Sequence, residues 1–238
     1  LRPAGGFPFD FPFRIRSGGE VMTVNAATSS VVDTFTRTTT PGWGTPDVGS
    51  AWVSTGGAAA DHYTQGTEAA HQLTAVDVAR LDLTPVSGAD HDVQVDIATA
   101  ALATGGPQLA SVVARAADGD NLYMAQLSIS TAQVITLTLR KRVAGAETQL
   151  ATYTTTLTHA AFTFYRVRLQ VIGPSLQATV RTASAVDQNI WRVTATDTAL
   201  TTGSNVGCRS VRQTANTNAN LVVSWDNVAL LNPQTLTV

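Results

Sequence analysis

Acidic side chains that could act as a catalytic pair are scarce in this sequence. Hydrolysis of a glycoside needs two carboxylates facing one cleft about 5–9.5 Å apart, one of them with a raised pKa. The three glutamates are Glu20, Glu68 and Glu147, and none lies two or four residues from another acid. Asp90 and Asp92 would share one face of a strand about 6.6 Å apart, but Asp90 follows a Gly-Ala pair at the mouth of that strand. The pattern favours a solvated face, and we expect no enzyme activity.

Patterns typical of a metal site are also weak. The four histidines have neither the i,i+4 spacing of a helical zinc site nor an i,i+2 spacing on a strand, and we expect each at the surface or at a rim: they are His62, His71, His91 and His159. The run from Asp118 to Asn121 offers oxygen ligands for Ca²⁺, but it lacks the further carboxylates that such sites require. A turn explains this run, so we predict no bound metal and no cofactor.

Aromatic side chains are the next candidates, because sugar binding needs an aromatic platform with polar groups around it. Trp43 lies between two glycines in an expected loop, where its ring either anchors the loop or faces a ligand. Tyr123 and Arg115 would line the face beside a hairpin turn at residues 117–120. The candidate glycan-binding residues are therefore Trp43, Arg115, Asp118, Asp120 and Tyr123.

The start of the chain has a different pattern. Four of the seven phenylalanines fall in the first thirteen residues and alternate with period two, while Pro8 and Pro12 fall on the opposite face. Proline cannot donate to a ladder, so the segment is an edge strand or an extended arm. It either packs on this protein's own body or docks on a neighbouring subunit, which would make the protein part of an oligomer or a larger assembly. The candidate assembly residues are Phe7, Phe9, Phe11, Phe13 and Ile15.

Composition limits the possible partners. The chain has 238 residues, of which 44% are hydrophobic and 13% charged, and its formal net charge is −2. Charged residues make up about 25% of an average domain. A disordered chain would need few apolar residues and a large net charge, and a nucleic-acid binder would need an excess of Lys and Arg. No run reaches the roughly 18 apolar residues of a membrane span. We expect neither nucleic-acid binding nor membrane insertion.

From Val31 onward, period-two segments rich in Val, Ile, Leu and Thr recur every ten to fifteen residues between turn signals. The clearest segment, 165–171, places Tyr165, Val167 and Leu169 on one face and arginines on the other. About a dozen antiparallel strands in one unit predict an all-β fold, an antiparallel two-sheet jelly-roll sandwich. We divide the chain into an N-terminal arm (1–25), a linker (26–30), the sandwich (31–231) and a C-terminal tail (232–238).

Several motifs resemble bacterial laminin-G-like domains of the concanavalin A-like lectin/glucanase superfamily, over residues 31 to about 231. The motifs are Asp33-x-Phe35-x-Arg37, Gly42-Trp43-Gly44, Gly49-x-x-Trp52, Gly56-Gly57, Arg115-x-x-Asp118-Gly119-Asp120-Asn121-x-Tyr123, Arg166-x-Arg168-Leu169-Gln170-Val171 and Ser224-Trp225-Asp226-Asn227-Val228. The resemblance implies the concanavalin A-like sandwich and is poorly specific for a task.

Such domains occur in secreted actinobacterial proteins and in the tail proteins of phages that infect those bacteria. The Phe-Pro-Phe-Asp-Phe-Pro-Phe run at residues 7–13 is similar to a strand that closes domains of siphophage tail proteins. Together the resemblances imply a minor tail protein: a non-enzymatic structural and adhesion subunit in the virion, with other tail proteins as partners and host cell-wall glycan as a further contact. The alternatives are a secreted polysaccharide-binding module and, less favoured, a glucanase.

Overall fold

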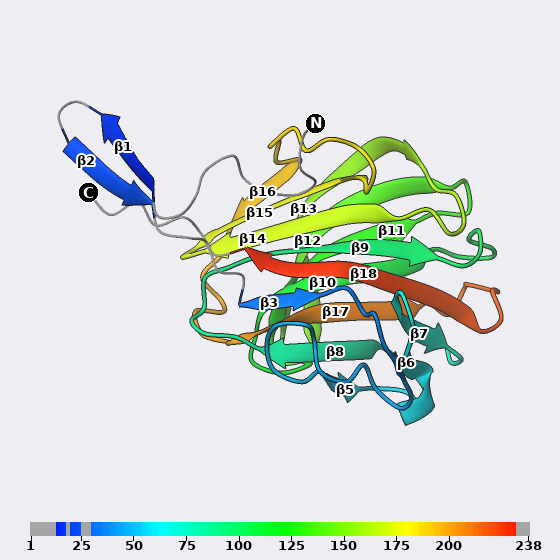
Figure 1. The fold of residues 1–238 in the computed structure, drawn as a ribbon. Coiled ribbons are helices and arrows are strands. Elements are labelled where there is room, and N and C mark those ends of the chain that lie inside the picture. The colour runs from blue at the N-terminus through cyan, green and yellow to red at the C-terminus, as the bar shows by residue number, and fades with distance from the viewer. Residues whose placement is uncertain (1–12, 18–19, 25–29, 232–238) are drawn as a thin grey trace, which may run out of the picture.

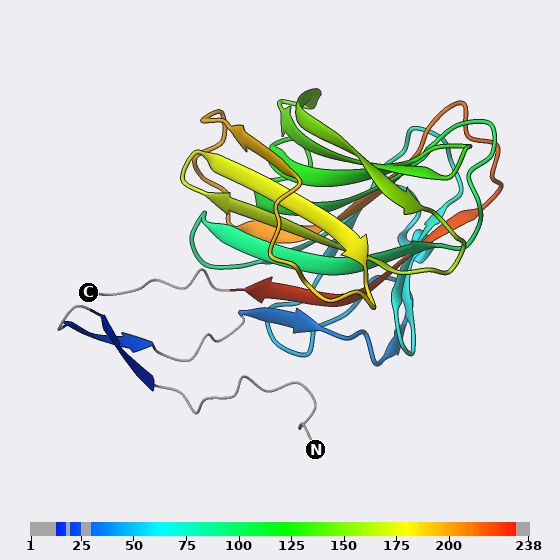
Figure 2. The same ribbon diagram turned by 90° about the horizontal axis from the view of Figure 1, so that it is seen from above.

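The computed structural model describes residues 13–17, 20–24 and 30–231. Most of this chain is divided between two antiparallel sheets that pack face to face (Figures 1 and 2). The only helical element in the described ranges is a short 3₁₀ turn, η1 (Ala59–Asp61). No helix within those ranges has the length and apolar character needed to cross a membrane. The predicted all-β sandwich is confirmed.

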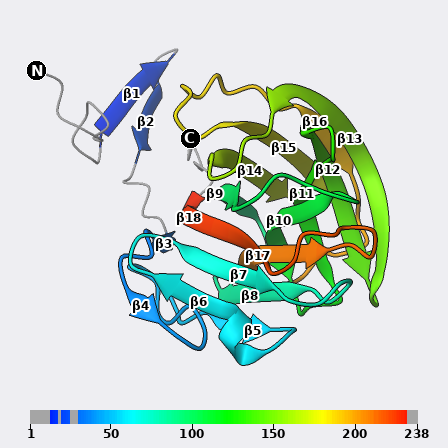
Figure 3. The same ribbon diagram turned by 90° about the vertical axis from the view of Figure 1, so that its right-hand side faces the viewer.

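One sheet has seven strands in the order β13 (Ala146–Thr158), β12 (Val134–Val143), β11 (Leu122–Ile129), β10 (Gln108–Ala116), β17 (Asn205–Arg212), β8 (Arg80–Pro85) and β5 (Val53–Thr55). The other has nine: β16 (Val193–Thr196), β15 (Ser175–Thr182), β14 (Tyr165–Ile172), β9 (His91–Thr99), β18 (Leu221–Leu231), β7 (Ala69–Leu73), β6 (His62–Gln65) and β4 (Thr38–Thr39), with β3 (Val31–Asp33) paired to β18. The edge strands β13 and β16 lie on one side of the sandwich, and β5 and β6 lie on the other (Figure 3).

The core forms because each long strand places alternate residues between the sheets. In β14, Tyr165, Val167 and Leu169 are buried in the core, whereas Arg166 and Arg168 lie on the outer face. Burial of each large apolar side chain contributes about 1.5–3 kcal/mol. On the outer face, both arginines form bidentate ion pairs with acids of the neighbouring strand β9.

The Asp33-x-Phe35-x-Arg37 motif has a structural explanation. The carboxylate of Asp33 is fully buried and accepts two hydrogen bonds from the Arg37 guanidinium, at 2.8 and 2.7 Å. It also accepts one from Nε1 of Trp52 at 2.7 Å. The Phe35 ring contacts both the Arg37 guanidinium and the Trp52 ring. It also packs edge-on against Trp43, with ring centroids 5.3 Å apart. The motif therefore fixes the entry of the chain into the sandwich.

The N-terminal segment is described only in part. Phe7, Phe9 and Phe11 lie outside the described residues. Phe13 and Ile15 belong to β1 (Phe13–Ser17), which pairs with β2 (Glu20–Val24) in a separate two-stranded sheet. Residues 13–17 and 20–24 are thus paired antiparallel strands inside the region that the sequence predicted as an extended arm. Whether the arm packs on its own chain or on another subunit stays a prediction.

Residues 183–192 form a loop between β15 and β16. Asn189 in this loop has a φ of 51°, a left-handed conformation that interrupts an extended strand. This loop forms a wall of two cavities.

Candidate functional site

A groove crosses the outer face of the seven-stranded sheet over β10 to β13, with a volume of about 320 Å³. We call it the sheet groove. Strand alternation builds it, because Ala125 and Leu127 of β11 enter the core while Gln126 and Ser128 point outward. Its lining is almost entirely hydroxyl, amide and charged groups: Leu109, Gln126, Ser128, Thr136, Thr138, Arg140, Glu147, Gln149, Thr152 and Gln213.

An ion pair shows that this face is concave. Nη2 of Arg209 in β17 lies 2.9 Å from Oε1 of Glu147 in β13, although three strands separate β17 from β13 in the sheet. Four strand spacings in a flat sheet are about 19 Å, too far for two side chains to meet. The sheet must therefore curl, with the groove inside the curve.

Gln126 is the central polar group of the groove. The residue is only 5% exposed, and its amide makes no hydrogen bond to another described residue. The amide atoms are not among the buried polar atoms left without a partner, so they reach the open space of the groove. Thr138 beside Gln126 makes a 3.3 Å contact to the Thr152 hydroxyl. The floor therefore offers donors and an acceptor to a ligand or to water.

A single carboxylate, Glu147, lines the groove among the described residues. Besides Arg209, its oxygens lie 3.3 Å from Arg140 and 3.4 Å from Arg142. Three guanidinium groups thus surround this carboxylate. This arrangement supports recognition of a polar ligand and lacks a second carboxylate for glycoside hydrolysis.

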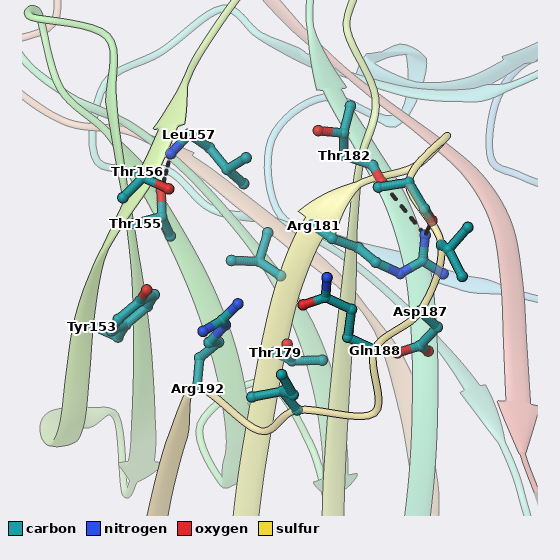
Figure 4. Close-up of a pocket in the computed structure, with 14 residues that line it drawn as sticks. Tyr153, Thr155, Thr156, Leu157, Thr179, Arg181, Thr182, Asp187, Gln188 and Arg192 are labelled. Carbon is teal, nitrogen blue, oxygen red and sulfur yellow. Dashed lines mark hydrogen bonds between the residues drawn. The ribbon is translucent and has the colours of Figure 1, made fainter.

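A second cavity of about 170 Å³ opens where the two sheets meet at their edges, between β13, β15 and the loop 183–192 (Figure 4). We call it the edge pocket. The guanidinium of Arg192 lies over the ring of Tyr153, 5.7 Å from its centroid. Arg181, Asp187 and Gln188 line the remaining sides. Sequence patterns gave no signal for it, because strands 146–158 and 175–182 belong to different sheets.

Two of the predicted glycan-binding residues are buried in the core. Trp43 is fully buried, and its ring packs against Trp52 and His71 at centroid distances of 5.3 and 4.8 Å. Tyr123 is also fully buried, and its hydroxyl donates to Oδ1 of Asp197 at 2.6 Å. Neither ring has a face for a sugar, so their prediction as a platform was wrong. Their neighbours are distant in sequence, which is why local patterns did not reveal them.

Arg115 is a structural residue. It is 3% exposed and donates to the carbonyls of Ala89, Gly173 and Leu200 and to the carboxylate of Asp90. It therefore ties three loops together, although it also borders a cavity of about 270 Å³.

Asp118 and Asp120 are exposed in the turn between β10 and β11. Asp118 accepts from the backbone N of Asp120 at 2.8 Å, and Asp120 pairs with Arg142 at 2.9 Å. These contacts stabilise a turn, and the two acids lie outside the lining of the sheet groove and of the edge pocket.

The prediction that the histidines lie at the surface was wrong, because all four are buried. Two of them form a cluster with Asp82 between the sheets. His62 and His71 are directly paired across β6 and β7. Nδ1 of His62 and Nε2 of His71 lie 2.5 and 2.7 Å from the same oxygen of Asp82 in the opposite sheet. A prediction that residues 62 and 71 pair across neighbouring strands would have indicated that the two histidines lie together.

The hydrogen bonds assign the protons in this cluster. His62 faces acceptors on both nitrogens, Asp82 and the Gly56 carbonyl, so its ring is an imidazolium. Burial opposes this charge, but the contact with Asp82 raises the His62 pKa. His71 accepts from Ser210 and stays neutral, since burial lowers its pKa. Burial favours protonation of Asp82, yet the two histidines lower its pKa to about 2.

The same three side chains are a donor set that suits Zn²⁺, with ligand atoms within 4.8 Å of one another. Both nitrogens already bond directly to Asp82 at hydrogen-bond distances. Hydrogen bonds account for all four ring nitrogens, so the cluster is complete as an ion pair that links the sheets.

Two acids do meet on the outer face of the nine-stranded sheet. Asp226 of β18 stands directly opposite Asp96 of β9, and the amide of Asn227 donates to both. Burial and the charges of Asp96 and Glu68 raise the Asp226 pKa to about 6. Asp96 is held by Arg166 at 2.5 Å. The described cavities have no lining residue from this pair.

We expect Asp82→Asn to lower the free energy of unfolding by about 3–5 kcal/mol, because the buried His62 charge loses its counter-ion. Urea unfolding at pH 7 measures the change. Asp120→Asn is the matched control at an exposed ion pair and should cost less than about 1 kcal/mol. Equal losses in the two variants would contradict the buried ion pair. In the wild type, stabilisation by Asp82 is complete above the ordinary pKa of 3.8 and is lost as the pH falls toward 2.

Asp226→Asn should raise the melting temperature at pH 7. The folded state binds the Asp226 proton more tightly than the unfolded state, so ionisation destabilises the fold as the pH rises from about 4 to about 6. The gain should therefore disappear near pH 4. Asp118→Asn is the control, since hydrogen bonds lower the pKa of that exposed carboxylate. An NMR titration midpoint for Asp226 near 4 would disprove this account.

No protein-family model matches the chain, and no curated protein matches it. Solved structures do resemble it. The carbohydrate-binding module CBM66 from Bacillus subtilis aligns with 76% of this chain and 95% of its own at 16% identity and a TM-score of 0.52. The Bacillus licheniformis β-glucanase aligns with 87% of this chain and 99% of its own at 11% identity and a TM-score of 0.61. The Ca²⁺/Man3GlcNAc-bound exoplasmic/lumenal domain of VIP36 covers 79% of this chain and 86% of its own, at 12% identity and a TM-score of 0.56. The chain therefore has the concanavalin A-like lectin/glucanase fold.

Proposed function

We propose that this protein is a non-catalytic carbohydrate-binding domain that holds a glycan in the sheet groove. The observation that carries the proposal is the polar lining of the groove, whose floor presents the Gln126 amide, with no hydrogen bond to another described residue, at the open surface. Threonine and serine hydroxyls surround it, together with Glu147 and Arg140. Sugar hydroxyls both donate and accept, so they match such a mixed lining.

The fold neighbours support this class of ligand. One is named as a carbohydrate-binding module, and another was solved with Man3GlcNAc bound. The likeness is one of fold, so the argument for this chain rests on its own groove. The carboxylates support the non-catalytic part of the proposal: Glu147 is the one acid among the described lining residues, and three arginines surround it.

Gln126→Leu tests the groove. The variant removes the Gln126 amide and should weaken glycan binding about five- to thirtyfold, because a hydrogen bond in such a site contributes about 1–2 kcal/mol. Binding is measured by affinity electrophoresis against laminarin, barley β-glucan, arabinogalactan and mannan. Gln94→Leu, half-buried in β9 of the other sheet, is the matched control.

Two outcomes would refute the proposal. The wild type could bind none of the four polysaccharides, or Gln126→Leu could bind as tightly as Gln94→Leu. Release of reducing sugar from any of them would contradict the non-catalytic part alone.

A second proposal places this domain in a phage tail as an adhesion subunit, located in the virion and joined to other tail proteins through its N-terminal arm. The Phe-Pro segment at residues 7–13 supports it, as does the β1–β2 hairpin, which no ladder joins to the two sandwich sheets in the described structure. A large apolar stripe needs a covering surface. The alternative is a secreted polysaccharide-binding module.

Deletion of residues 1–24 should leave a folded sandwich that no longer self-associates or joins its assembly. Light scattering after size-exclusion chromatography reports the mass, and circular dichroism reports the fold. The variant with Ser in place of Phe7, Phe9 and Phe11 keeps the length of the chain and should behave in the same way. Loss of folding in both proteins would instead show that the arm is part of the core.

A further inference from the structure

The edge pocket contains two arginines that form no ion pair with a described acid. Between residues 30 and 231, nine of the twelve Lys and Arg side chains form an ion pair with a carboxylate within 4.0 Å. The three others are Arg181, Arg192 and Arg212. Two of these three line the edge pocket. In a chain that pairs its cations so consistently, this concentration of unpaired positive charge points to an anion supplied from outside.

Arg192 is positioned to receive that anion. Its backbone N donates to the Ala178 carbonyl at 2.9 Å, which fixes the residue beside β15. Its guanidinium lies over the Tyr153 ring and makes no hydrogen bond to another described residue. Stacking on an aromatic ring orients the planar donors of arginine without using them. The donors of Arg192 thus remain available on one side of the cavity (Figure 4).

Arg181 supplies the second positive charge from the other side (Figure 4). Its Nη1 donates to the carbonyls of Thr182, Ala183 and Ala185, which holds the loop in place. These bonds involve Nη1 alone, and they add no negative charge. Asp187 is the single carboxylate among the described lining residues, and it forms no ion pair within 4.0 Å with either arginine. It accepts from the backbone N of Asn189, so the pocket keeps a net positive charge.

The rest of the lining suits a sugar ring. Thr179 and Gln188 offer hydroxyl and amide groups, while Leu157 and Ile190 add apolar surface. The volume of about 170 Å³ is far larger than the roughly 10–15 Å³ that holds one water. A ligand of several heavy atoms therefore fits.

We propose that the edge pocket binds an acidic saccharide, with the carboxylate or phosphate of the sugar against the Arg192 guanidinium. Guanidinium groups bind both oxyanions through paired N–H donors. The choice of a saccharide rests on the proposed function, whereas the requirement for a negative charge does not. Together the edge pocket and the sheet groove give the domain two separate contacts with a glycan.

Three ligands with the same ring test the charge requirement: glucuronate, glucose 6-phosphate and glucose. NMR titration of the ¹⁵N-labelled protein measures each dissociation constant and follows the side-chain Nε–H of Arg192. At least one of the two acids should bind about tenfold or more tightly than glucose, and the difference should shrink as salt is raised. Comparison of the two acids shows whether a carboxylate or a phosphate is preferred.

Variants test the location. Arg192→Gln should abolish the preference for the acids, and Arg192→Lys, which keeps the charge but loses the planar donors, should retain part of it. Arg212→Gln removes the same charge elsewhere and should leave the preference unchanged. If glucose binds as tightly as the acids, if no ligand binds, or if Arg192→Gln keeps the preference, the inference is wrong.

Failure of this inference is distinguishable from failure of the proposed function. Gln126→Leu alters the groove and should leave glucuronate and glucose 6-phosphate binding unchanged. Conversely, Arg192→Gln should leave binding of the neutral polysaccharides unchanged. Loss of acid binding in Gln126→Leu would place the anion in the groove and overturn the assignment to the edge pocket.

Discussion

The alternation of side chains along paired strands is the constraint on which this molecule depends. A strand between two sheets must give every second residue to the core, so the remaining residues form the outer faces. In β11 this rule buries Ala125 and Leu127 and leaves Gln126 and Ser128 outside. Curling of the seven-stranded sheet then gathers such residues from several strands into one groove. The proposed binding surface is therefore a consequence of the same pattern that builds the core.

Because charged residues are few, most ion pairs of this protein can be assigned a structural role. Charged residues make up 13% of the chain, and many of the described acids form ion pairs with arginines. Asp92 and Asp96 pair with arginines of β14 on the outer face of the nine-stranded sheet. Glu147 of β13 pairs with Arg209 of β17. Arginine donors contact both oxygens of Asp92 and both oxygens of Asp96. Arg181 and Arg192 differ from most described cations, because neither forms an ion pair with a described acid.

Buried carboxylates in this fold connect separate strands and loops through hydrogen bonds. Asp82 joins the two sheets by accepting from two histidines, and Asp33 joins Arg37 and Trp52 near the start of the sandwich. Close packing supports the first contact. Gly56, whose carbonyl accepts from His62, has a φ of +81°, and a Cβ there would lie 2.0 Å from the Ala79 carbonyl oxygen. Only glycine fits this position without movement of the backbone.

The strands and the two-sheet sandwich were predictable from the sequence, since alternation is local and segments such as 165–171 carry it within a few residues. The functions of individual polar and aromatic residues were not predictable in this way. Trp43 and Tyr123 resembled ligand platforms, yet each is covered by residues far away in the chain. His62 and His71 are buried where Asp82 faces them from the other sheet, and the edge pocket exists because β13 and β15 meet across the sandwich. Local sequence determines which face a side chain takes on its strand, whereas the packing of distant strands decides what that face meets.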